Sequence, residues 1–516
     1  MNTIKEVSPY ALISPLRLDI AVKYMYFQCL HLDYMTDAVA DLYDRHIMLR
    51  TGGIEPIDLF GNLSKKTSIE DYKTQSVSLL ASLKKDGFKA EFPIPVSSTG
   101  IRNGAHRLAA SLVLKKPIVV NYFEGPSGIW DYNWFKNNNF SQDDLMRILR
   151  AFILISPEQS AIFTFWGSSE KIWQPMSQFL SENIDIVGTI DLDFTGQTFA
   201  FSELIKDIYK IIEPTDGTDN ISRKINILSE ANLKLRVIVA WKSIDSLSKG
   251  SIFDKVKEIK EKCRKQFKSI LQESAFVTLH SSGDHEESLH LANILLSPNN
   301  ILRLRQRMNT FHYHQDVFCA WLKEFSAVAN ANNICIDNTC IVGSSPLEVV
   351  GIRASTDIDF TLISKDRIRF GSGVTKLSDN IDIVTEKYHR SKENCSAVDD
   401  ALITLDDLHF FYRGFRFADI DVVYDRKLFS ARDKDLRDVA LIDSFRTTKE
   451  HTVLDAPFRL KSEITNELIV RRFTEIIRGL ENQLRHYNYL VPLLENRIKI
   501  LEEYSNEHKA SLGKNK

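Results

Sequence analysis

The chain has 516 residues, of which 66 are Lys or Arg and 68 are Asp or Glu, so its formal net charge is −2. This length exceeds what one hydrophobic core normally organises, and we expect two to four domains. Because the charges nearly cancel, no overall field attracts nucleic acid or anionic membranes, and a nucleic-acid partner is not favoured. The six cysteines are scattered without a CxxC pair, which argues against both a zinc cluster and a disulfide scaffold.

The N-terminal segment lacks a basic stretch followed by an apolar core, so we do not expect a signal peptide. No uninterrupted apolar run reaches the length of a membrane span. These features, with the scattered cysteines, predict a protein without a membrane span that works in the reducing cytoplasm.

Residues 1–135 are expected to form a first unit. Its pattern predicts helices and short strands, and a Gly- and Asn-rich connector follows it at residues 125–139. The helices are expected at residues 19–45 and 68–85, and the strands at residues 93–96 and 118–122.

A strand, a turn and a helix are predicted where the first unit reads FPIPVSSTGIRNGAHRLAASLVL. The turn falls at Asn103 and Gly104, and the helix begins near His106. Free backbone amides at a helix start, together with Arg107, make an anion site, and Gly104 would let the backbone come close to a phosphate. The simplest alternative is a glycine turn with a capping histidine and a surface arginine.

This segment resembles the ParB/sulfiredoxin-like fold, in which a Gly-containing turn and a His-Arg pair opening a helix bind nucleotide phosphate. The resemblance implies nucleotide-binding roles for Gly104, His106 and Arg107. By analogy with the kinase-like members, Glu55 is a weaker candidate for a general base. The usual acidic residue before the glycine is Asn103 here, and no cysteine stands near His106, which disfavours a reductase.

Residues 148–325 are expected to form a middle α/β unit of unknown role, because strand-like apolar runs alternate with helical ones. One run leads into HSSGDHEESLHLANILL, where a strand meets a helix. Capping of the helix by Ser282 or Asp284 is the simplest interpretation.

The density of histidines in this segment exceeds what a cap needs. His280, His285 and His290, near the carboxylate of Glu286, could bind a transition metal or act in acid–base chemistry near neutral pH. Their spacing of five and five does not place all three on one helical face, so a common metal is not favoured. We therefore regard His280, His285 and Glu286 as weaker site candidates.

Residues 326–445 contain the sequence GSSPLEVVGIRASTDIDFTL, which predicts a turn at Gly343 and Ser344 followed by a strand. Side chains two apart on a strand share a face, so Asp357 and Asp359 should project together while the apolar residues between them anchor the core. Paired carboxylates of this kind suit a hard divalent ion that keeps coordination sites for phosphate oxygens. The simplest alternative is that these two aspartates mark an exposed strand end or a salt-bridge pair.

These motifs resemble those of the polymerase-beta-like nucleotidyltransferase superfamily, which implies a mixed sheet. Carried over by position, Gly343 and Ser344 would bind nucleotide phosphates, and Asp357 and Asp359 would be catalytic metal ligands. A third carboxylate normally lies on a neighbouring strand. In RFADIDVVYD we expect Asp421 in this role, with Asp419 as the alternative on the same alternating strand.

A C-terminal helical or coiled-coil segment is expected over residues 460–508, because apolar residues recur there at spacings of three and four. Pro492 interrupts it, so two helices or one kinked helix should form. The apolar stripe could make a homo-oligomer or fold back on its own domain.

The complete sequence therefore predicts a multidomain α/β and α+β protein. The expected activity is a metal-dependent nucleotidyl- or phosphotransferase that uses Mg²⁺ or Mn²⁺ and a nucleoside triphosphate such as ATP. The balanced charge favours a small or sugar-type hydroxyl acceptor, and the combination of units resembles proteins of bacterial surface-polysaccharide loci. Two alternatives stay open: a nucleotide-binding ParB-like DNA-associated regulator, and a toxin or defence nucleotidyltransferase.

Overall fold

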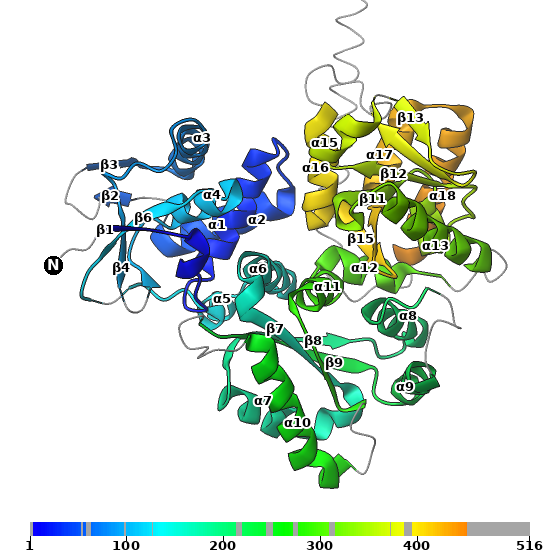
Figure 1. Ribbon diagram of the computed structural model, residues 1–516, viewed down its shortest axis with the longest axis horizontal. Coiled ribbons are helices and arrows are strands. Elements are labelled where there is room, and N and C mark those ends of the chain that lie inside the picture. Colours follow the sequence, from blue (N-terminus) through cyan, green and yellow to red (C-terminus); the bar gives the residue numbers. More distant parts are fainter. Residues whose placement is uncertain are drawn as a thin grey trace, which may run out of the picture. The chain divides into compact units, whose positions relative to one another are not determined.

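In the part of the chain that it describes, the computed structural model contains helices together with four sheets, which confirms the mixed α/β character of the chain (Figure 1). It describes residues 4–52, 55–57, 63–97, 100–125, 127–212, 219–243, 251–271, 277–308, 315–371, 373–385 and 395–450. The chain divides into a unit of residues 1–445 and a unit of residues 446–516. The predicted helical segment at 460–508 lies outside the described residues. Within them, no helix is long and apolar enough to cross a membrane.

The first sheet has the order β1-β6-β4-β5, with β4 parallel to β6 and the other pairs antiparallel. Helices α1 to α4 pack around its core, and a separate pair, β2-β3, lies between α2 and α3 in sequence. The bounds are β1 Ile4–Val7, α1 Asp19–His31, α2 Asp37–Thr51, β2 Glu55–Ile57, β3 Leu63–Lys66, α3 Ile69–Asp86, β4 Ile94–Ser97, β5 Gly100–Ile101, α4 Ala105–Leu114 and β6 Ile118–Tyr122.

The single helix predicted at residues 19–45 is two helices, which corrects that expectation. Asp33 takes a left-handed conformation with φ of 52° between them. Thr36 then caps α2 by accepting a hydrogen bond from the amide of Val39 at 3.4 Å. A second helix can begin here because the threonine side chain accepts a hydrogen bond from a first-turn amide, which in a continuous helix would be bonded by the preceding turn. The expected connector likewise contains a helix, α5 Tyr132–Asn137.

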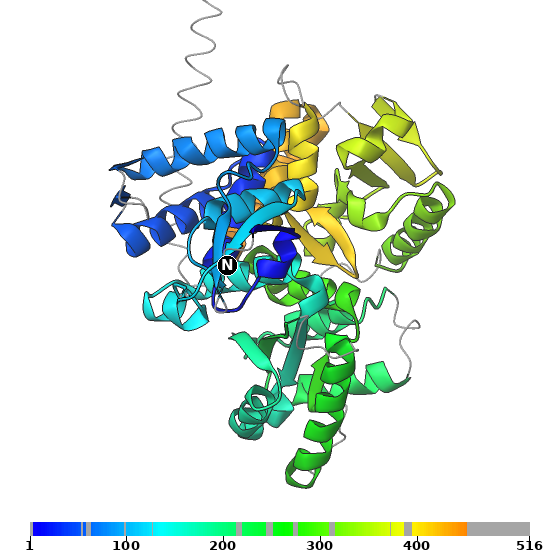
Figure 2. The ribbon, with the colours of Figure 1, turned by 60° about the vertical axis from the view of Figure 1, so that its left-hand side comes forward.

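The middle sheet has the order β10-β7-β9-β8, and every neighbouring pair is antiparallel. Its two faces belong to two apolar clusters, one of them covered by α7 and by the long α10 (Figure 1 and Figure 2). The bounds are α6 Gln142–Ile155, β7 Ser160–Trp166, α7 Trp173–Ser181, β8 Asp185–Asp193, α8 Thr198–Ile208, α9 Asp219–Glu230, β9 Lys234–Trp241, α10 Ile252–Leu271, β10 Leu279–Ser281, α11 His285–Leu295 and α12 Pro298–Gln306.

The third sheet is mixed, with the order β13-β14-β12-β11-β16-β15. Strand β12 is parallel to β14 and antiparallel to β11, and β11 is parallel to β16. The bounds are α13 Gln315–Ala331, β11 Thr339–Val342, α14 Ser345–Val350, β12 Ile358–Leu362, α15 Ser364–Arg367, β13 Gly373–Lys376, β14 Ile381–Thr385, α16 Cys395–Thr404, β15 His409–Tyr412, β16 Phe415–Ala418, α17 Ile420–Ser430 and α18 Asp433–Glu450.

A buried ionic network joins the turn between β15 and β16 to α8. Arg413, at that turn, donates to Asp207 at 2.7 Å and to Glu203 at 2.6 Å, while Arg307 donates to Asp207 at 2.7 Å. All four side chains are buried. Two guanidinium groups against two carboxylates neutralise the charge that burial would otherwise penalise.

Candidate functional site

The turn at Gly343 lies directly against the carboxylate of Asp359. Strand β11 ends at Val342, and Gly343 has a φ of 71°, a left-handed conformation that glycine adopts without steric cost. A Cβ added at Gly343 would stand 2.5 Å from Oδ2 of Asp359. The absence of a side chain therefore lets this backbone turn and this carboxylate occupy adjacent space.

Serine hydroxyls fasten the turn to the start of β12. Ser344 and Ser355 share a hydrogen bond of 2.8 Å between their Oγ atoms. The backbone carbonyl of Asp357 accepts from Oγ of Ser345 at 2.9 Å and from Oγ of Ser355 at 2.8 Å. These bonds set the distance between the predicted phosphate-binding turn and the predicted metal-binding acids.

Three carboxylates meet beside this turn. Asp359 lies on β12, Asp357 immediately precedes that strand, and Asp382 is the residue of β14 paired with Asp359. Residues directly opposite each other on paired strands point to the same face. The intervening Ile358 and the following Phe360 are fully buried, as the alternation predicts.

The electrostatics of these acids reflect their proximity. Burial, followed by the charges of Asp357 and Asp382, raises the pKa of Asp359 to about 6. Burial and Asp357 also raise the pKa of Asp382. In addition, Oδ1 of Asp382 is buried and has no hydrogen-bond partner among the described residues. The cluster therefore carries more negative charge than its surroundings compensate.

Cationic side chains of α17 and α18 act on the same cluster. Lys434 and Lys427 lower the pKa of Asp359, although less than burial and the other acids raise it. Lys434 is exposed, whereas Lys427 is held by Asp438 at 2.6 Å. Exposed positive charge close to the acids suits the negative tail of a triphosphate.

The expected third carboxylate is corrected by the structure. Asp419 and Asp421 do not lie on a strand: Asp419 is the N-cap of α17, accepting from the amide of Asp421 at 2.8 Å, and Asp421 lies in the first helical turn. Arg303 binds both, at 2.7 Å to Asp419 and at 2.8 Å to Asp421. Neither is among the groups that shift the pKa of Asp359.

Asp382, which sequence reasoning did not consider, lies on β14, the strand paired with β12, where a third carboxylate was expected. A signal was present, because Ile381, Asp382 and Ile383 alternate apolar and acidic residues like β12 does. What the alternation could not reveal is that β14 pairs with β12 in register.

The acids fit a hard divalent cation by their chemistry. Carboxylate oxygens are the ligands Mg²⁺ and Mn²⁺ prefer, and a cation would relieve the repulsion that raises the pKa of Asp359. Within the described residues, no group of three or more His, Cys, Asp or Glu side chains is placed so that it could hold a metal ion. Mg²⁺ usually binds one or two carboxylates and completes its shell with water and phosphate oxygens, so an open arrangement is compatible with it.

We expect Gly343→Ala to disable this site. The matched control is Gly52→Ala, because Gly52 also has a left-handed backbone, with a φ of 65°, but nothing lies within 4 Å of an added Cβ. Both variants should lose about 1 kcal/mol of stability from left-handed backbone strain. Only Gly343→Ala should also displace Asp359 and weaken Mn²⁺ binding, measured by calorimetric titration alongside thermal unfolding. Equal Mn²⁺ affinities in the two variants would contradict the contact.

The predicted anion site of the first unit is placed at the start of α4. Gly104 is its N-cap, with a φ of 87°, and its amide donates to Oδ1 of Asn103 at 2.7 Å. His106 bonds Tyr43 through Nε2 at 2.9 Å, and burial holds its pKa well below the ordinary value, so the imidazole is neutral. Arg107 donates to the carbonyl of Phe92.

Next to this helix start, the first unit buries a group that sequence reasoning missed. Asp19 pairs with Arg17 at 2.8 Å and with Lys23 at 2.7 Å, and all three side chains are buried. Burial lowers the pKa of Lys23 to about 7, although Asp19 opposes the shift. Both ring nitrogens of the buried His46 lack hydrogen-bond partners among the described residues. The spacing of an arginine, an aspartate and a lysine at a helix start was the available signal.

The histidines of the middle unit are not brought together. Asp284, one of the two expected caps, caps α11 by accepting a hydrogen bond from the backbone amide of Glu287 at 2.7 Å. His290 is bound by the carbonyl oxygens of Asp207 and Ile208 at 3.0 and 3.2 Å.

The other weaker candidates are also dispersed. Nδ1 of His285 lies 3.8 Å from a carboxylate oxygen of Glu158, whereas Nε2 of His280 lies 3.1 Å from a carboxylate oxygen of Glu287. Glu286 is exposed in the first turn of α11. Glu55 begins β2, and its side chain lies outside the described residues.

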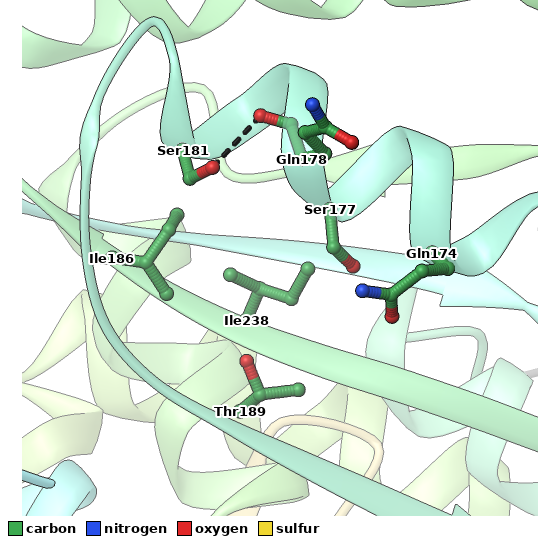
Figure 3. A pocket seen from close by; sticks show the side chains of 7 residues that line it. All are labelled: Gln174, Ser177, Gln178, Ser181, Ile186, Thr189 and Ile238. Carbon is green, nitrogen blue, oxygen red and sulfur yellow. Dashed lines mark hydrogen bonds between the residues drawn. The ribbon is translucent and has the colours of Figure 1, made fainter. Parts of the chain in front are cut away.

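A depression of about 450 Å³ lies on the middle unit between α7 and the sheet. Its lining consists of amide, hydroxyl and aliphatic side chains, shown in Figure 3: Gln174, Ser177, Gln178, Ser181, Ile186, Thr189 and Ile238. The hydroxyl of Ser181 is turned back to the carbonyl of Gln178, at 2.8 Å. Because none of these side chains is charged or titratable near neutral pH, the depression offers no acid–base or metal chemistry.

Comparison with known proteins finds no family model, no curated protein and no solved structure that matches this chain.

Proposed function

We propose that the chain is a metal-dependent nucleotidyl- or phosphotransferase whose active site lies between the Gly343 turn and the ends of β12 and β14. The observation that carries the proposal is the cluster of Asp357, Asp359 and Asp382, whose excess negative charge faces a glycine turn. Transfer of a phosphoryl or nucleotidyl group depends mainly on positioning and on neutralising charge, and such a cluster supplies both through a bound cation.

Each part of the site has a defined role in this proposal. Asp357 and Asp359 hold Mg²⁺ or Mn²⁺, which would neutralise phosphate charge when bound, and the charge of Asp382 strengthens the attraction for the cation. The amides of Gly343 and Ser344 and the ammonium of Lys434 bind the triphosphate of a nucleotide such as ATP. The serine hydroxyls around the carbonyl of Asp357 keep the turn and the acids in fixed relation. A small or sugar-type hydroxyl acceptor agrees with the near-zero net charge, and surface-polysaccharide modification is the context we favour.

The acids provide a direct test of activity. Wild type should release pyrophosphate or transfer phosphate from one of the four nucleoside triphosphates in the presence of Mg²⁺ and a panel of sugar and polyol acceptors. Asp359→Asn and Asp382→Asn should each lower kcat at least about a hundredfold, because each removes charge that positions the cation. Asp379→Asn is the matched control, since Asp379 is 96% exposed and pairs with Lys376.

The same panel separates the two possible third acids. Asp421→Asn should retain activity, because Asp421 is bound by Arg303 away from the cluster. Loss of activity in Asp421→Asn with full activity in Asp382→Asn would reverse the assignment.

The raised pKa of Asp359 predicts a pH-dependent stability. The folded chain keeps the proton up to about pH 6, whereas the unfolded carboxyl loses it near about pH 4. The contribution of Asp359 therefore favours folding below about pH 4 and is lost as pH rises through about 6. At pH 7 in EDTA, Asp359→Asn should raise the midpoint of thermal unfolding by roughly 2–4 °C, the shift for about 1 kcal/mol.

Added Mn²⁺ should reverse the order of thermal stability of the wild type and Asp359→Asn. The wild type should gain thermal stability with Mn²⁺ at pH 7, because the cation offsets the repulsion, while Asp359→Asn should gain little. If Asp359→Asn were less stable than the wild type in EDTA, the charged carboxylate of Asp359 would not destabilise the folded chain, and the prediction would be wrong.

A second function, nucleotide-dependent regulation through the first unit, is favoured by one observation. Lys23, Lys66 and Arg50 all act electrostatically on His106 at the start of α4, so positive charge gathers where the resemblance places nucleotide phosphate.

For this second function, Arg107→Ala should weaken ATP or CTP binding about tenfold, the effect of losing one charge-assisted bond. The exposed Arg102→Ala serves as control, and the doubly substituted Asp359→Asn, Asp382→Asn chain removes the transferase site from the measurement. Equal affinities of Arg107→Ala and Arg102→Ala, measured by calorimetry, would exclude this site, and salt-sensitive binding to duplex DNA would extend it to a DNA-associated regulator.

A further inference from the structure

An uncharged polar stripe runs along one face of α7 in the middle unit. It consists of four residues spaced by three and four, which share a helix face: Gln174, Ser177, Gln178 and Ser181. The nine residues of α7 include no charged side chain. An exposed helix face normally carries charged residues, as that of α10 does, so the stripe is not an ordinary solvated face.

The stripe borders the depression of about 450 Å³ between α7 and the middle sheet, which we call the α7 depression (Figure 3). On the opposite side, Thr189 of β8 and Ile238 of β9 are paired in register, and Ile186 lies further along β8. Small-molecule sites have volumes of roughly 300–1,000 Å³. The α7 depression is therefore large enough for one small ligand.

Hydrogen-bonding groups in the α7 depression lack partners within the protein. Oγ of Ser177 is buried and has no partner among the described residues, which is costly for a hydroxyl group. In that part of the chain, the side-chain amide of Gln174 and the hydroxyl of Thr189 likewise make no hydrogen bond to the protein. These three side chains offer donors and acceptors to a bound molecule.

Two further groups of the stripe can still accept hydrogen bonds. Ser181 donates to the carbonyl of Gln178 at 2.8 Å, so the lone pairs of its Oγ stay available. Nε2 of Gln178 donates to the carboxylate of Glu182 at 3.1 Å, which leaves Oε1 as an acceptor. The α7 depression thus combines donors with acceptors, and none of its described lining residues is cationic.

Backbone groups along the adjacent sheet edge are already bonded. β8 is an edge strand of the middle sheet, and three of its carbonyl oxygens accept from side chains of other elements. These bonds run from Tyr132 to Thr189 at 2.5 Å, from Gln142 to Asp191 at 3.2 Å and from Arg305 to Asp193 at 2.9 Å. A peptide that added a strand here would have to displace these bonds, so recognition by side chains is favoured.

We propose that the α7 depression binds a neutral saccharide. Each sugar hydroxyl both donates and accepts hydrogen bonds, which matches a lining of amide and hydroxyl groups. Phosphate and ionised carboxylate oxygens only accept, and no described lining residue would neutralise their charge. Ile186 and Ile238 match the apolar C–H face of a sugar ring. None of these residues belongs to the proposed transferase site, so the inference does not depend on that activity.

The test is calorimetric titration of the full chain with three neutral probes: glucose, N-acetylglucosamine and maltose. Wild type should bind at least one of them saturably. Gln174→Ala and Thr189→Val should each weaken that binding about threefold or more, because each removes hydrogen bonds between neutral groups. Thr189→Val keeps the branched shape of the side chain and removes only its hydroxyl.

Two controls separate this site from the rest of the molecule. Gln266→Ala changes an exposed glutamine of α10 that does not line the α7 depression, so it should bind like wild type. The chain with both Asp359→Asn and Asp382→Asn should also bind like wild type, which makes the result independent of the transferase acids. Where Thr189→Val fails to fold, judged by circular dichroism, the exposed Gln174→Ala carries the test.

A charged sugar tests the preference for a neutral ligand. Glucuronate, which carries a carboxylate in place of one hydroxymethyl group of glucose, should bind more weakly than the neutral probes that bind. Three results would each overturn the proposal: no saturable binding of any neutral probe, tighter binding of glucuronate than of every neutral probe, or equal affinities of Gln174→Ala, Thr189→Val and Gln266→Ala.

Discussion

The pairing of buried negative charge governs how this chain is built. Asp19 is matched by Arg17 and Lys23, Asp207 by Arg307 and Arg413, and Asp419 by Arg303. A buried carboxylate without such a partner costs several kcal/mol, so these pairs fix which helix ends and turns can meet. The acids at the ends of β12 and β14 break this rule, since burial and the neighbouring acids raise the pKa of Asp359 and no guanidinium among the described residues pairs with it. That contrast is the physical basis for assigning them a function.

Local patterns predicted the acidic cluster only as far as local geometry defines it. The alternation around Asp359 places Ile358 and Phe360 in the core, and the glycine turn before it adopts the left-handed backbone that the motif requires. The alternation at Asp419 and Asp421 was deceptive, because two acids spaced by one residue also fit a helix N-cap and its first turn. So short a segment does not distinguish the period of a strand from that of a helix. The ion pairs of these acids with Arg303 are visible only in three dimensions.

Contacts between distant segments account for what sequence reasoning missed. Asp382 joins the cluster because β14 runs parallel to β12 in register, and this pairing leaves no trace in the spacing of residues. The mixed helices and sheets were predictable from alternating runs, whereas the antiparallel order of the middle sheet was not. The density of histidines suggested a functional site, although their spacing did not favour a common metal. His280, His285 and His290 each face a different partner, and His280 on β10 lies 3.4 Å from the hydroxyl of Tyr209, at the end of α8.

The turn at Arg413 has a consequence for the evolution and dissection of this chain. The guanidinium group of Arg413 donates hydrogen bonds to Glu203 and Asp207, which both lie on α8. A gene fragment beginning near residue 326 would separate Arg413 from both carboxylates, leaving Asp207 with Arg307 and Glu203 with Lys206, and breaking a buried pair in this way costs about 3–5 kcal/mol. Recombination that exchanges the C-terminal sheet between relatives must therefore transfer or recreate this ionic lock, so the two segments are expected to be inherited together.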